Sequence, residues 1–412
     1  MSGPAVIIGA SHGGVQAAAA LRQQGWEEEV ILLSAEDALP YHRPPLSKAF
    51  LSAEKTDADI LLRGEDFYAG QGIALEMGIR VDHIDPAARR IRMGARSLSY
   101  GALILGVGAR ARRPALDGLD WQGVHMLRDL ADARQLKAAL EGAGHLVIIG
   151  GGFIGLEVAA TAVKTGTSVT VLEAQDRILA RAVPAALSHW LAKQHRAAGV
   201  AIRLGCSVDR LEGEAGRVRA VRLADGTRLD ADLVLVGIGS EAARELADDA
   251  GLAGAAGGIL VDGACRSSAP GVYALGDCAS QFNRFAGAVT RIESVQNATE
   301  QARIVAQALT GKAPGEPGAN WFWTDQYALK IQMAGLVVPG CPVTVRGEPD
   351  SGTFSLLQMQ RGSLVAAFSV NHPADHMAAR RLIAAGAKLD PVLAADGLVP
   401  LAKAAVMAEK AA

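Results

Sequence analysis

The chain has 412 residues, of which 50% are hydrophobic and 47 are glycines, and its formal net charge is -2. This length predicts two or three domains, and this composition is typical of a compact α/β protein that is rich in tight turns. The small net charge argues against a nucleic-acid partner, and the lack of any run of about 18 apolar residues argues against a membrane span.

The beginning of the chain and its cysteines indicate a compartment. The sequence runs from Met1 directly into an apolar stretch, without a basic segment and an apolar signal core, which predicts a cytoplasmic protein. The cysteines form no C-x-x-C pair, so we expect no metal, iron-sulfur or dithiol site. Buried free thiols are expected instead. The cysteines are Cys206, Cys265, Cys278 and Cys341.

The first predicted unit is a strand, a glycine-rich turn and a helix. The apolar run Ala5–Ile8 leads into Gly9-Ala10-Ser11-His12-Gly13-Gly14, an Ala-rich stretch follows, and Val30–Leu33 is the next strand. In this context the N–H groups at the start of the helix face a pyrophosphate, which is typical of a dinucleotide-binding turn. For one such turn alone, an ordinary tight loop is an equal alternative.

Two positions of this unit depart from the usual pattern. Ser11 stands where the second glycine is expected; its Cβ is a mild steric objection, whereas its hydroxyl could donate to a phosphate oxygen. The ribose-binding carboxylate is expected within Ser34-Ala35-Glu36-Asp37, where we choose Glu36 or a direct neighbour. The candidate cofactor contacts here are Gly9, Ser11, Gly13, Gly14, Ala35 and Glu36.

A proline segment follows at Tyr41-His42-Arg43-Pro44-Pro45-Leu46-Ser47-Lys48. Its two prolines remove backbone donors and predict an extended turn that presents Arg43 and Lys48 rigidly. Positive charge beside a flavin would stabilise its anionic reduced form. The alternative is a pair of surface cations on a proline loop.

A second dinucleotide-binding turn lies about 140 residues after the first. The strand Leu146–Ile149 leads into Gly150-Gly151-Gly152-Phe153-Ile154-Gly155, and Val169–Leu172 is the following strand. Two turns in matching contexts make coincidence improbable and predict two bound dinucleotides. The candidate contacts of this turn are Gly150, Gly152, Ile154 and Gly155.

Glu173 ends that following strand, 18 residues after Gly155, at the spacing of a ribose-binding carboxylate. It predicts NADH, because an NADP 2′-phosphate would be repelled by roughly 3 kcal/mol per charge pair at about 5 Å and an effective dielectric near 20. Arg177 could soften this repulsion. The alternative is a strand-end carboxylate that faces water.

Glu157 lies two residues past Gly155. It is either a helix-start carboxylate favoured by the helix dipole or, together with Lys48, an ion pair at the cofactor junction.

The rest of the chain suggests an insertion and a third domain. Short apolar strands return at 230–239 and 271–277, so we expect the second domain to be inserted into the first. From Trp321 the strands are shorter, at Phe354–Met359 and Leu364–Val370, and a helical tail follows. The predicted ranges are 1–112 with 242–318 for an FAD-binding domain, 113–241 for an NADH-binding domain and 319–412 for a small α+β domain.

These residues together resemble the FAD-dependent and NADH-dependent ferredoxin reductases, over essentially the whole chain. The segments that carry the resemblance are Tyr41–Lys48, Gly150–Glu157, Val272–Asp277, Arg291–Ala298 and Trp321–Gln326. The resemblance implies an α/β protein of glutathione-reductase-like architecture, with two Rossmann-like dinucleotide-binding domains, one inserted in the other, and a small α+β domain. Its implied cofactors are FAD and NADH.

The resemblance also implies roles for single residues. Lys48 matches a lysine near flavin N5, Glu157 its carboxylate partner, and Asp277 an aspartate that binds the ribityl chain. Val81, Arg128 and Val295 match positions that contact FAD, and Trp323 matches an aromatic residue near the flavin and the nicotinamide. By composition alone Trp323 would more often be core.

Three departures from the family pattern concern the FAD contacts. Ser11 replaces a glycine, Ala35 stands where an acidic residue is frequent, and 240–244 replaces a segment that usually carries a Pro-Asn pair.

The implied activity is hydride transfer from NADH to FAD and single-electron transfer to a 2Fe-2S ferredoxin. That ferredoxin would serve a haem-thiolate monooxygenase or a ring-hydroxylating dioxygenase. A rubredoxin reductase is a close alternative. NADH oxidases and peroxidases of this architecture need a redox cysteine, which the segment 43–48 lacks. A protein similar to apoptosis-inducing factor, which changes its oligomeric state on binding NADH, is a third alternative. The sequence is silent on oligomeric state.

Overall fold

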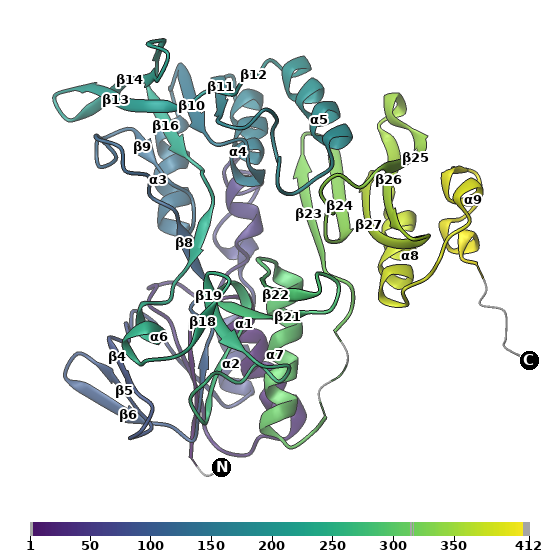
Figure 1. Cartoon of the computed structure of the whole chain (residues 1–412). Coiled ribbons are helices and arrows are strands. Elements are labelled where there is room, and N and C mark those ends of the chain that lie inside the picture. The colour runs from purple at the N-terminus through teal and green to yellow at the C-terminus, as the bar shows by residue number, and fades with distance from the viewer. Residues whose placement is uncertain (1–2, 314, 316, 407–412) are drawn as a thin grey trace, which may run out of the picture. The chain divides into compact units, whose positions relative to one another are not determined.

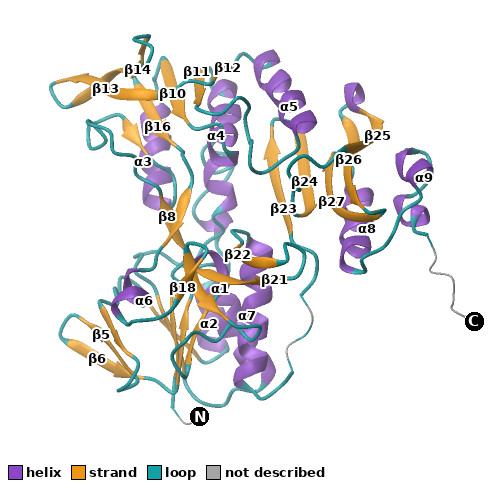
Figure 2. Ribbon diagram, viewed as in Figure 1, coloured by secondary structure: helices purple, strands orange, loops and turns teal. Residues whose placement is uncertain are grey.

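The computed structural model describes residues 3–313, 315 and 317–406. The chain forms two compact units (Figures 1 and 2). The first unit comprises Met1–His42, Asp57–Arg110 and Ser240–Pro317, and the second comprises Arg43–Thr56, Ala111–Gly239 and Gly318–Ala412. The three predicted domain ranges stay a prediction. Residues 1–2, 314, 316 and 407–412, which those ranges include, lie outside the described residues.

A parallel sheet forms the centre of the first unit. Its strand order is β20-β7-β1-β2-β3, which in chain order reads 5-4-1-2-3, the arrangement of a dinucleotide-binding fold. The order reverses at β1, the strand that leads into the first glycine-rich turn. The strands are β1 (Ala5–Ile8), β2 (Val30–Leu33), β3 (Ile73–Glu76), β7 (Ala102–Leu105) and β20 (Val272–Ala274).

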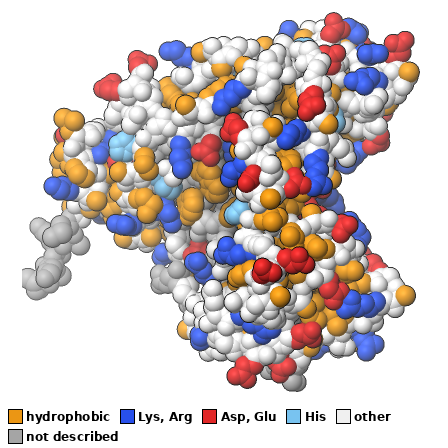
Figure 3. All heavy atoms as spheres, turned by 180° about the vertical axis from the view of Figure 1, so that it is seen from behind, with side chains coloured by type: hydrophobic (Ala, Val, Ile, Leu, Met, Phe, Trp, Pro, Cys, Tyr) orange, Lys and Arg blue, Asp and Glu red, His pale blue; other side chains and the backbone are white. Residues whose placement is uncertain are grey.

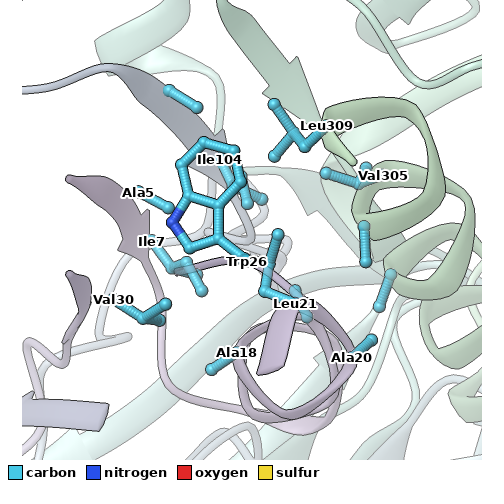
Figure 4. Close-up of a cluster of buried hydrophobic side chains, with 14 of the residues drawn as sticks. Ala5, Ile7, Ala18, Ala20, Leu21, Trp26, Val30, Ile104, Val305 and Leu309 are labelled. Carbon is cyan, nitrogen blue, oxygen red and sulfur yellow. The ribbon is translucent and has the colours of Figure 1, made fainter. Parts of the chain in front are cut away.

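Two helices cover one face of this sheet, α1 (His12–Gln24) and α7 (Val295–Leu309), which lie side by side in Figure 1. Figure 4 shows Trp26, 8% exposed, packed among Leu21, Val305 and Leu309. The apolar strand residues are buried on both faces, which is why these strands read as continuous hydrophobic runs.

Smaller elements complete the first unit. They are α2 (Glu65–Gly70), α6 (Glu245–Asp249), η2 (Ala58–Ile60), η3 (Gly276–Cys278), the antiparallel sheet of β4 (His83–Asp85), β5 (Arg90–Met93) and β6 (Arg96–Ser99), and the sheet of β18 (Gly254–Ala255), β19 (Gly258–Val261), β21 (Ala279–Asn283) and β22 (Ala288–Arg291). Where the chain passes between the units, β8 (Ala109–Ala111) pairs with β17 (Ser240–Ala242).

The second unit contains a second parallel sheet, of order β12-β11-β10-β16-β9. Its strands are β9 (Val124–His125), β10 (His145–Ile149), β11 (Ser168–Glu173), β12 (Ala201–Leu204) and β16 (Leu233–Val236), with helices α3 (Leu130–Leu140), α4 (Phe153–Lys164) and α5 (Ala185–Ala197). An antiparallel sheet of β13 (Val208–Glu214), β14 (Arg217–Leu223) and β15 (Arg228–Asp230) is attached to it. The predicted strands of both dinucleotide units are thus confirmed.

The C-terminal part of the second unit is an antiparallel sheet of order β23-β24-β27-β26-β25. Its elements are β23 (Trp321–Gln326), β24 (Leu329–Gly335), β25 (Val343–Glu348), η4 (Pro349–Ser351), β26 (Thr353–Gln360), β27 (Ser363–Val370), α8 (Pro373–Ala384), α9 (Pro391–Ala395) and η5 (Leu401–Ala404). One face of the sheet packs on α4 and α5 through an apolar cluster that includes Leu156, Leu191 and Phe368, and α8 packs on β24 and β27 (Figure 2).

The proline segment differs from the expected extended turn. Pro44–Ser47 is a 3-10 helix, η1, with both prolines in its first two positions. The fixed φ of proline suits the first turn of a helix, and the missing N–H groups have no acceptor there in any case. This segment belongs to the second unit, although the sequence around it belongs to the first.

The cysteines only partly match the expectation of buried thiols. Cys265 and Cys278 are buried, and burial raises their pKa values to about 12 and about 11. Cys206 and Cys341 are partly exposed. Residues 3–313, 315 and 317–406 contain no group of three or more His, Cys, Asp or Glu side chains placed to hold a metal ion.

Among the same residues, no helix is long and apolar enough to cross a membrane. Basic and acidic side chains are interspersed over the face drawn in Figure 3.

Candidate dinucleotide sites and a buried ion pair

The first glycine-rich turn is closely packed against the sheet. Gly9 has a φ of +108°, and a Cβ there would lie 2.3 Å from the carbonyl oxygen of Gly106. A Cβ on Gly14 would lie 1.9 Å from the carbonyl oxygen of Gly9. Ser11 precedes α1 with an extended backbone (φ -113°, ψ -163°), which any residue adopts without strain. Serine therefore carries no backbone penalty at this position.

Other predicted contacts of the first unit follow its strands. Glu36 lies after β2, where its Oε2 accepts a hydrogen bond of 2.5 Å from the hydroxyl of Tyr41, and its backbone N–H donates to Ser34 Oγ. Ala35, between Ser34 and Glu36, is exposed. Asp277 lies on η3 directly after β20, and Arg291 Nη1 donates to its backbone carbonyl at 2.9 Å.

The carboxyl ends of parallel strands meet at one edge of a sheet, so Gly9, Glu36 and Asp277 share that edge. Val295 begins α7, whose N-terminal turn is capped by Ser294 Oγ. Val81 is 6% exposed and packs in the core on the other face of the sheet. A dinucleotide suits this edge, because a Cβ on Gly9 or Gly14 would destroy the turn that points the start of α1 at a phosphate.

The second turn repeats this geometry. Gly150 has a φ of +111°, and a Cβ there would lie 2.3 Å from Gly237 O, while a Cβ on Gly155 would lie 2.5 Å from Gly150 O. A Cβ on Gly152 would meet its nearest atom, the Gly237 carbonyl oxygen, only at 3.9 Å. Gly152 therefore has open space beside its Cα. Ile154, one residue into the same helix, is 43% exposed.

Glu173 is held at this turn by backbone groups. Its Oε2 accepts from the N–H of Gly151 and its Oε1 accepts from the N–H of Gln175, both at 2.8 Å. Arg177 instead donates to the carbonyls of Val183 at 3.0 Å and Ala180 at 2.5 Å. The guanidinium thus holds its own loop, contrary to the expectation that it softens the charge of Glu173.

The predicted ion pair between Lys48 and Glu157 is confirmed. Lys48 Nζ lies 2.8 Å from Glu157 Oε1, and the two side chains are 18% and 6% exposed. Glu157 lies in the second turn of α4, too far along for the helix-start explanation. Ser47 Oγ donates to Glu157 Oε2 at 2.5 Å, and Thr161 Oγ1 donates to the carbonyl of Ser47 at 3.1 Å. α4 therefore holds η1 through side chain and backbone alike.

Two further contacts fix the same segment within the second unit. Arg43 Nη1 donates to the backbone carbonyl of Arg128 at 2.7 Å, and Lys137 on α3 lies over the ring of Phe50, with its Nζ 5.1 Å from the centroid. The structure thereby brings together Arg43 and Arg128, both of which were predicted to contact a cofactor.

Trp323 lies on β23, on the opposite face from Thr324. Its ring centroid is 5.6 Å from that of Trp321 and 6.2 Å from that of Phe322. It is partly exposed, which differs from the core position that composition alone favours.

Sequence reasoning missed the polar residues beneath the ion pair. Thr324 Oγ1 donates to Glu157 Oε1 at 2.6 Å, and Gln326 and His195 continue the hydrogen bonding. The signal in the sequence was the pair Thr324 and Gln326 in a strand that begins with three aromatic residues, since residues two apart share one face.

Two protein families match the chain. The family described as pyridine nucleotide-disulphide oxidoreductase matches residues 4–302, and the reductase C-terminal family matches residues 321–405. A ferredoxin--NAD(P)(+) reductase of Sphingomonas sp is 43% identical over 94% of each chain, and putidaredoxin reductase of Pseudomonas putida is 39% identical over 98% of this chain and 97% of its own.

Solved structures give the same result. The putidaredoxin reductase of a covalent complex with putidaredoxin has a TM-score of 0.94 at 38% identity, covering 97% of each chain. A ferredoxin reductase of Rhodopseudomonas palustris has a TM-score of 0.95 at 38% identity, covering 98% of this chain and 100% of its own. The chain therefore belongs to the pyridine nucleotide-disulphide oxidoreductase family and, within it, to the ferredoxin reductases.

Proposed function

We propose that this ferredoxin reductase binds FAD and NADH and supplies electrons singly to a 2Fe-2S ferredoxin that serves a haem-thiolate monooxygenase or a ring-hydroxylating dioxygenase. The observation that carries the proposal is the combination of two dinucleotide-binding turns with the buried Lys48–Glu157 pair. When bound, FAD accepts two electrons and a proton from NADH and releases the electrons one at a time. The names of the relatives, among them rhodocoxin reductase, terpredoxin reductase and a dioxygenase ferredoxin reductase component, support a redoxin partner.

The residues of the first unit would hold FAD. The turn at Gly9 and Gly14 would take the pyrophosphate, Glu36 the ribose, and the carboxylate of Asp277 would accept hydrogen bonds from ribityl hydroxyls. Trp323 belongs to the second unit, and the role that the family resemblance implies for its indole is to stack against the cofactor rings and limit their orientation.

Lys48 would place a positive charge beside the flavin ring. Its ammonium is kept in one position by Glu157, and η1 is kept in place by α4, so the charge costs no reorganisation when the cofactor gains electrons. Such a preorganised charge favours the reduced, anionic form of the ring system.

The second unit would bind NADH. Gly152 leaves room for the pyrophosphate, and the Glu173 carboxylate, fixed by two backbone N–H groups, would accept the ribose hydroxyls. The same fixed charge disfavours a 2′-phosphate.

A cytoplasmic location is part of this proposal. All four cysteines are free thiols, which suits a reducing compartment.

A rubredoxin is the second candidate acceptor, because rubredoxin-NAD(+) reductase of Pseudomonas putida is 36% identical over 89% of this chain. An NADH-sensing interaction protein would instead show slow turnover with every acceptor and a change of mass on adding NADH.

The test is anaerobic oxidation of NADH by the purified holoenzyme, alone and with a 2Fe-2S ferredoxin or a rubredoxin added. We expect little oxidation without an acceptor, rapid bleaching of the ferredoxin at a catalytic amount of enzyme, and a slower rubredoxin reaction. Rapid oxidation in air that no redoxin stimulates would contradict the proposal and indicate an oxidase.

A further inference from the structure

The Lys48–Glu157 pair has a third partner, and this partner comes from the C-terminal sheet. Thr324 on β23 is fully buried, and its Oγ1 donates a hydrogen bond of 2.6 Å to Glu157 Oε1. Phe322, two residues earlier on the same face of the strand, packs against Phe153 at the start of α4, with ring centroids 4.9 Å apart. β23 therefore lies directly against the helix that carries Glu157.

Thr324 is one member of a longer chain of hydrogen bonds. Gln326 Nε2 donates to Thr324 Oγ1 at 3.0 Å, Gln326 Oε1 lies 2.7 Å from His195 Nε2, and the Tyr327 hydroxyl lies 2.8 Å from His195 Nδ1. Gln326 is 2% and His195 0% exposed. Burying so many polar groups is costly unless each one is satisfied, so the completeness of this chain matters.

The chemistry of Glu157 fixes the direction of every bond in the chain. An ionised carboxylate only accepts hydrogen bonds, so the single hydroxyl proton of Thr324 must point to Glu157. Thr324 must then accept from the amide of Gln326, which leaves the carbonyl oxygen of Gln326 to accept from His195. His195 therefore carries its ring proton on Nε2, and its Nδ1 accepts from Tyr327.

His195 and Tyr327 lie at the end of the hydrogen-bond chain away from Glu157, and both have the protonation states that these donor directions require. Burial lowers the pKa of His195, against a smaller opposing effect of its hydrogen bond to Gln326, so the imidazole is neutral at pH 7. Burial raises the pKa of Tyr327 to about 12, so its phenol keeps the proton that it donates. All donors thus point toward the carboxylate.

We propose that Thr324 is a positioning residue for the Lys48–Glu157 pair and that Gln326, His195 and Tyr327 orient its hydroxyl. The proposal rests on the proposed function, in which this pair assists the reduction of FAD by NADH. Ser47, Lys48 and Thr324 each donate to the carboxylate, and three donors hold it in one orientation. The C-terminal sheet then helps to fix the position of the pair.

The first test is the rate of flavin reduction at increasing NADH concentrations, which separates the limiting rate from the binding of NADH. The holoenzyme is mixed with NADH in an anaerobic stopped-flow instrument without ferredoxin at pH 7.

We expect the limiting rate of flavin reduction to fall about 3- to 10-fold in Thr324→Val with an unchanged Kd for NADH, because the carboxylate that holds Lys48 loses one of three donors. Thr324→Ser keeps the donor and is expected to keep the wild-type limiting rate. Thr170→Val is the matched control, since Thr170 is also a buried strand threonine, hydrogen-bonded to His145. A Thr324→Val limiting rate equal to that of the wild type would overturn the proposal.

The second test needs neither NADH nor a ferredoxin. Nitrogen-15 NMR of histidine-labelled holoenzyme, with His195→Gln to identify the signals, is expected to show the Nε2–H tautomer at pH 7 and a pKa of His195 below its ordinary value. Tyr327→Phe, which removes the donor to Nδ1, is expected to shift those signals even if Thr324→Val does not fold. An Nδ1–H tautomer or an ordinary titration near pH 6.5 would refute the proposed chain of hydrogen bonds. If NADH fails to reduce the wild-type flavin, the proposed function fails, and this measurement still tests the hydrogen bonds independently.

Discussion

Replacing Glu173 by glutamine should shift the enzyme from NADH toward NADPH. Both carboxylate oxygens are tied to backbone N–H groups at 2.8 Å, so the charge cannot swing away from a 2′-phosphate. One charge pair at about 5 Å and an effective dielectric near 20 repels by about 3 kcal/mol, which corresponds to a factor of about 150. Arg177 cannot offset this repulsion, because its guanidinium is bound to the carbonyls of Val183 and Ala180.

The substitution also has a cost that both nucleotides share. A glutamine has one acceptor oxygen for two N–H groups, so either Gly151 or Gln175 loses its partner and the turn loses about 1 to 3 kcal/mol. The decisive quantity is therefore the ratio of kcat/KM for NADPH to that for NADH in anaerobic flavin reduction. We expect Glu173→Gln to raise it by up to about 100-fold.

Asp176 offers a matched control, because it carries the same charge nearby but is exposed, where water and salt screen it. Asp176→Asn should leave the ratio within about twofold of the wild type. An unchanged ratio in Glu173→Gln, or an equal change in both variants, would show that the carboxylate does not select the nucleotide.

Three further predictions concern other parts of the chain. Lys48→Met should slow flavin reduction by NADH at least 10-fold at saturating NADH, because the ring then lacks a charge worth on the order of 1.4 kcal/mol or more; a wild-type rate in stopped flow would be evidence against the assigned role. Arg346→Met should lower the free energy of unfolding by about 3 to 5 kcal/mol, because Asp375, its buried partner at 2.7 Å, loses its counter-charge. Urea unfolding measures this loss. The control is Arg92→Met, which breaks an exposed ion pair with Asp82 and is expected to cost under about 1 kcal/mol. His376 is buried, and desolvation together with the nearby charges of Arg380 and Lys330 lowers its pKa to about 4. The folded state therefore binds fewer protons than the unfolded state, and the free energy of unfolding should fall as the pH drops from about 6.5 toward 4. In His376→Gln this part of the pH dependence should vanish, and its persistence in urea titrations would point to other groups.

The sequence by itself determined the two dinucleotide units. Strands such as Ala5–Ile8 and Val30–Leu33 are continuous apolar runs because they are buried on both faces, and local pattern is enough to find them. Local requirements also explain why Gly9 and Gly150 could be found from the sequence. Each has a positive φ and a carbonyl oxygen 2.3 Å from any added Cβ, so only glycine fits the turn.

Only the tertiary structure decided where the proline segment lies and what completes the ion pair. Lys48 precedes Glu157 by 109 residues, and their contact depends on η1 packing against α4 of the second unit. Thr324 lies 167 residues beyond Glu157, and His195 reaches it only through Gln326. Polar residues at such separations carry no local periodicity, because their positions are set by the packing of whole elements and by the need to satisfy each buried donor and acceptor.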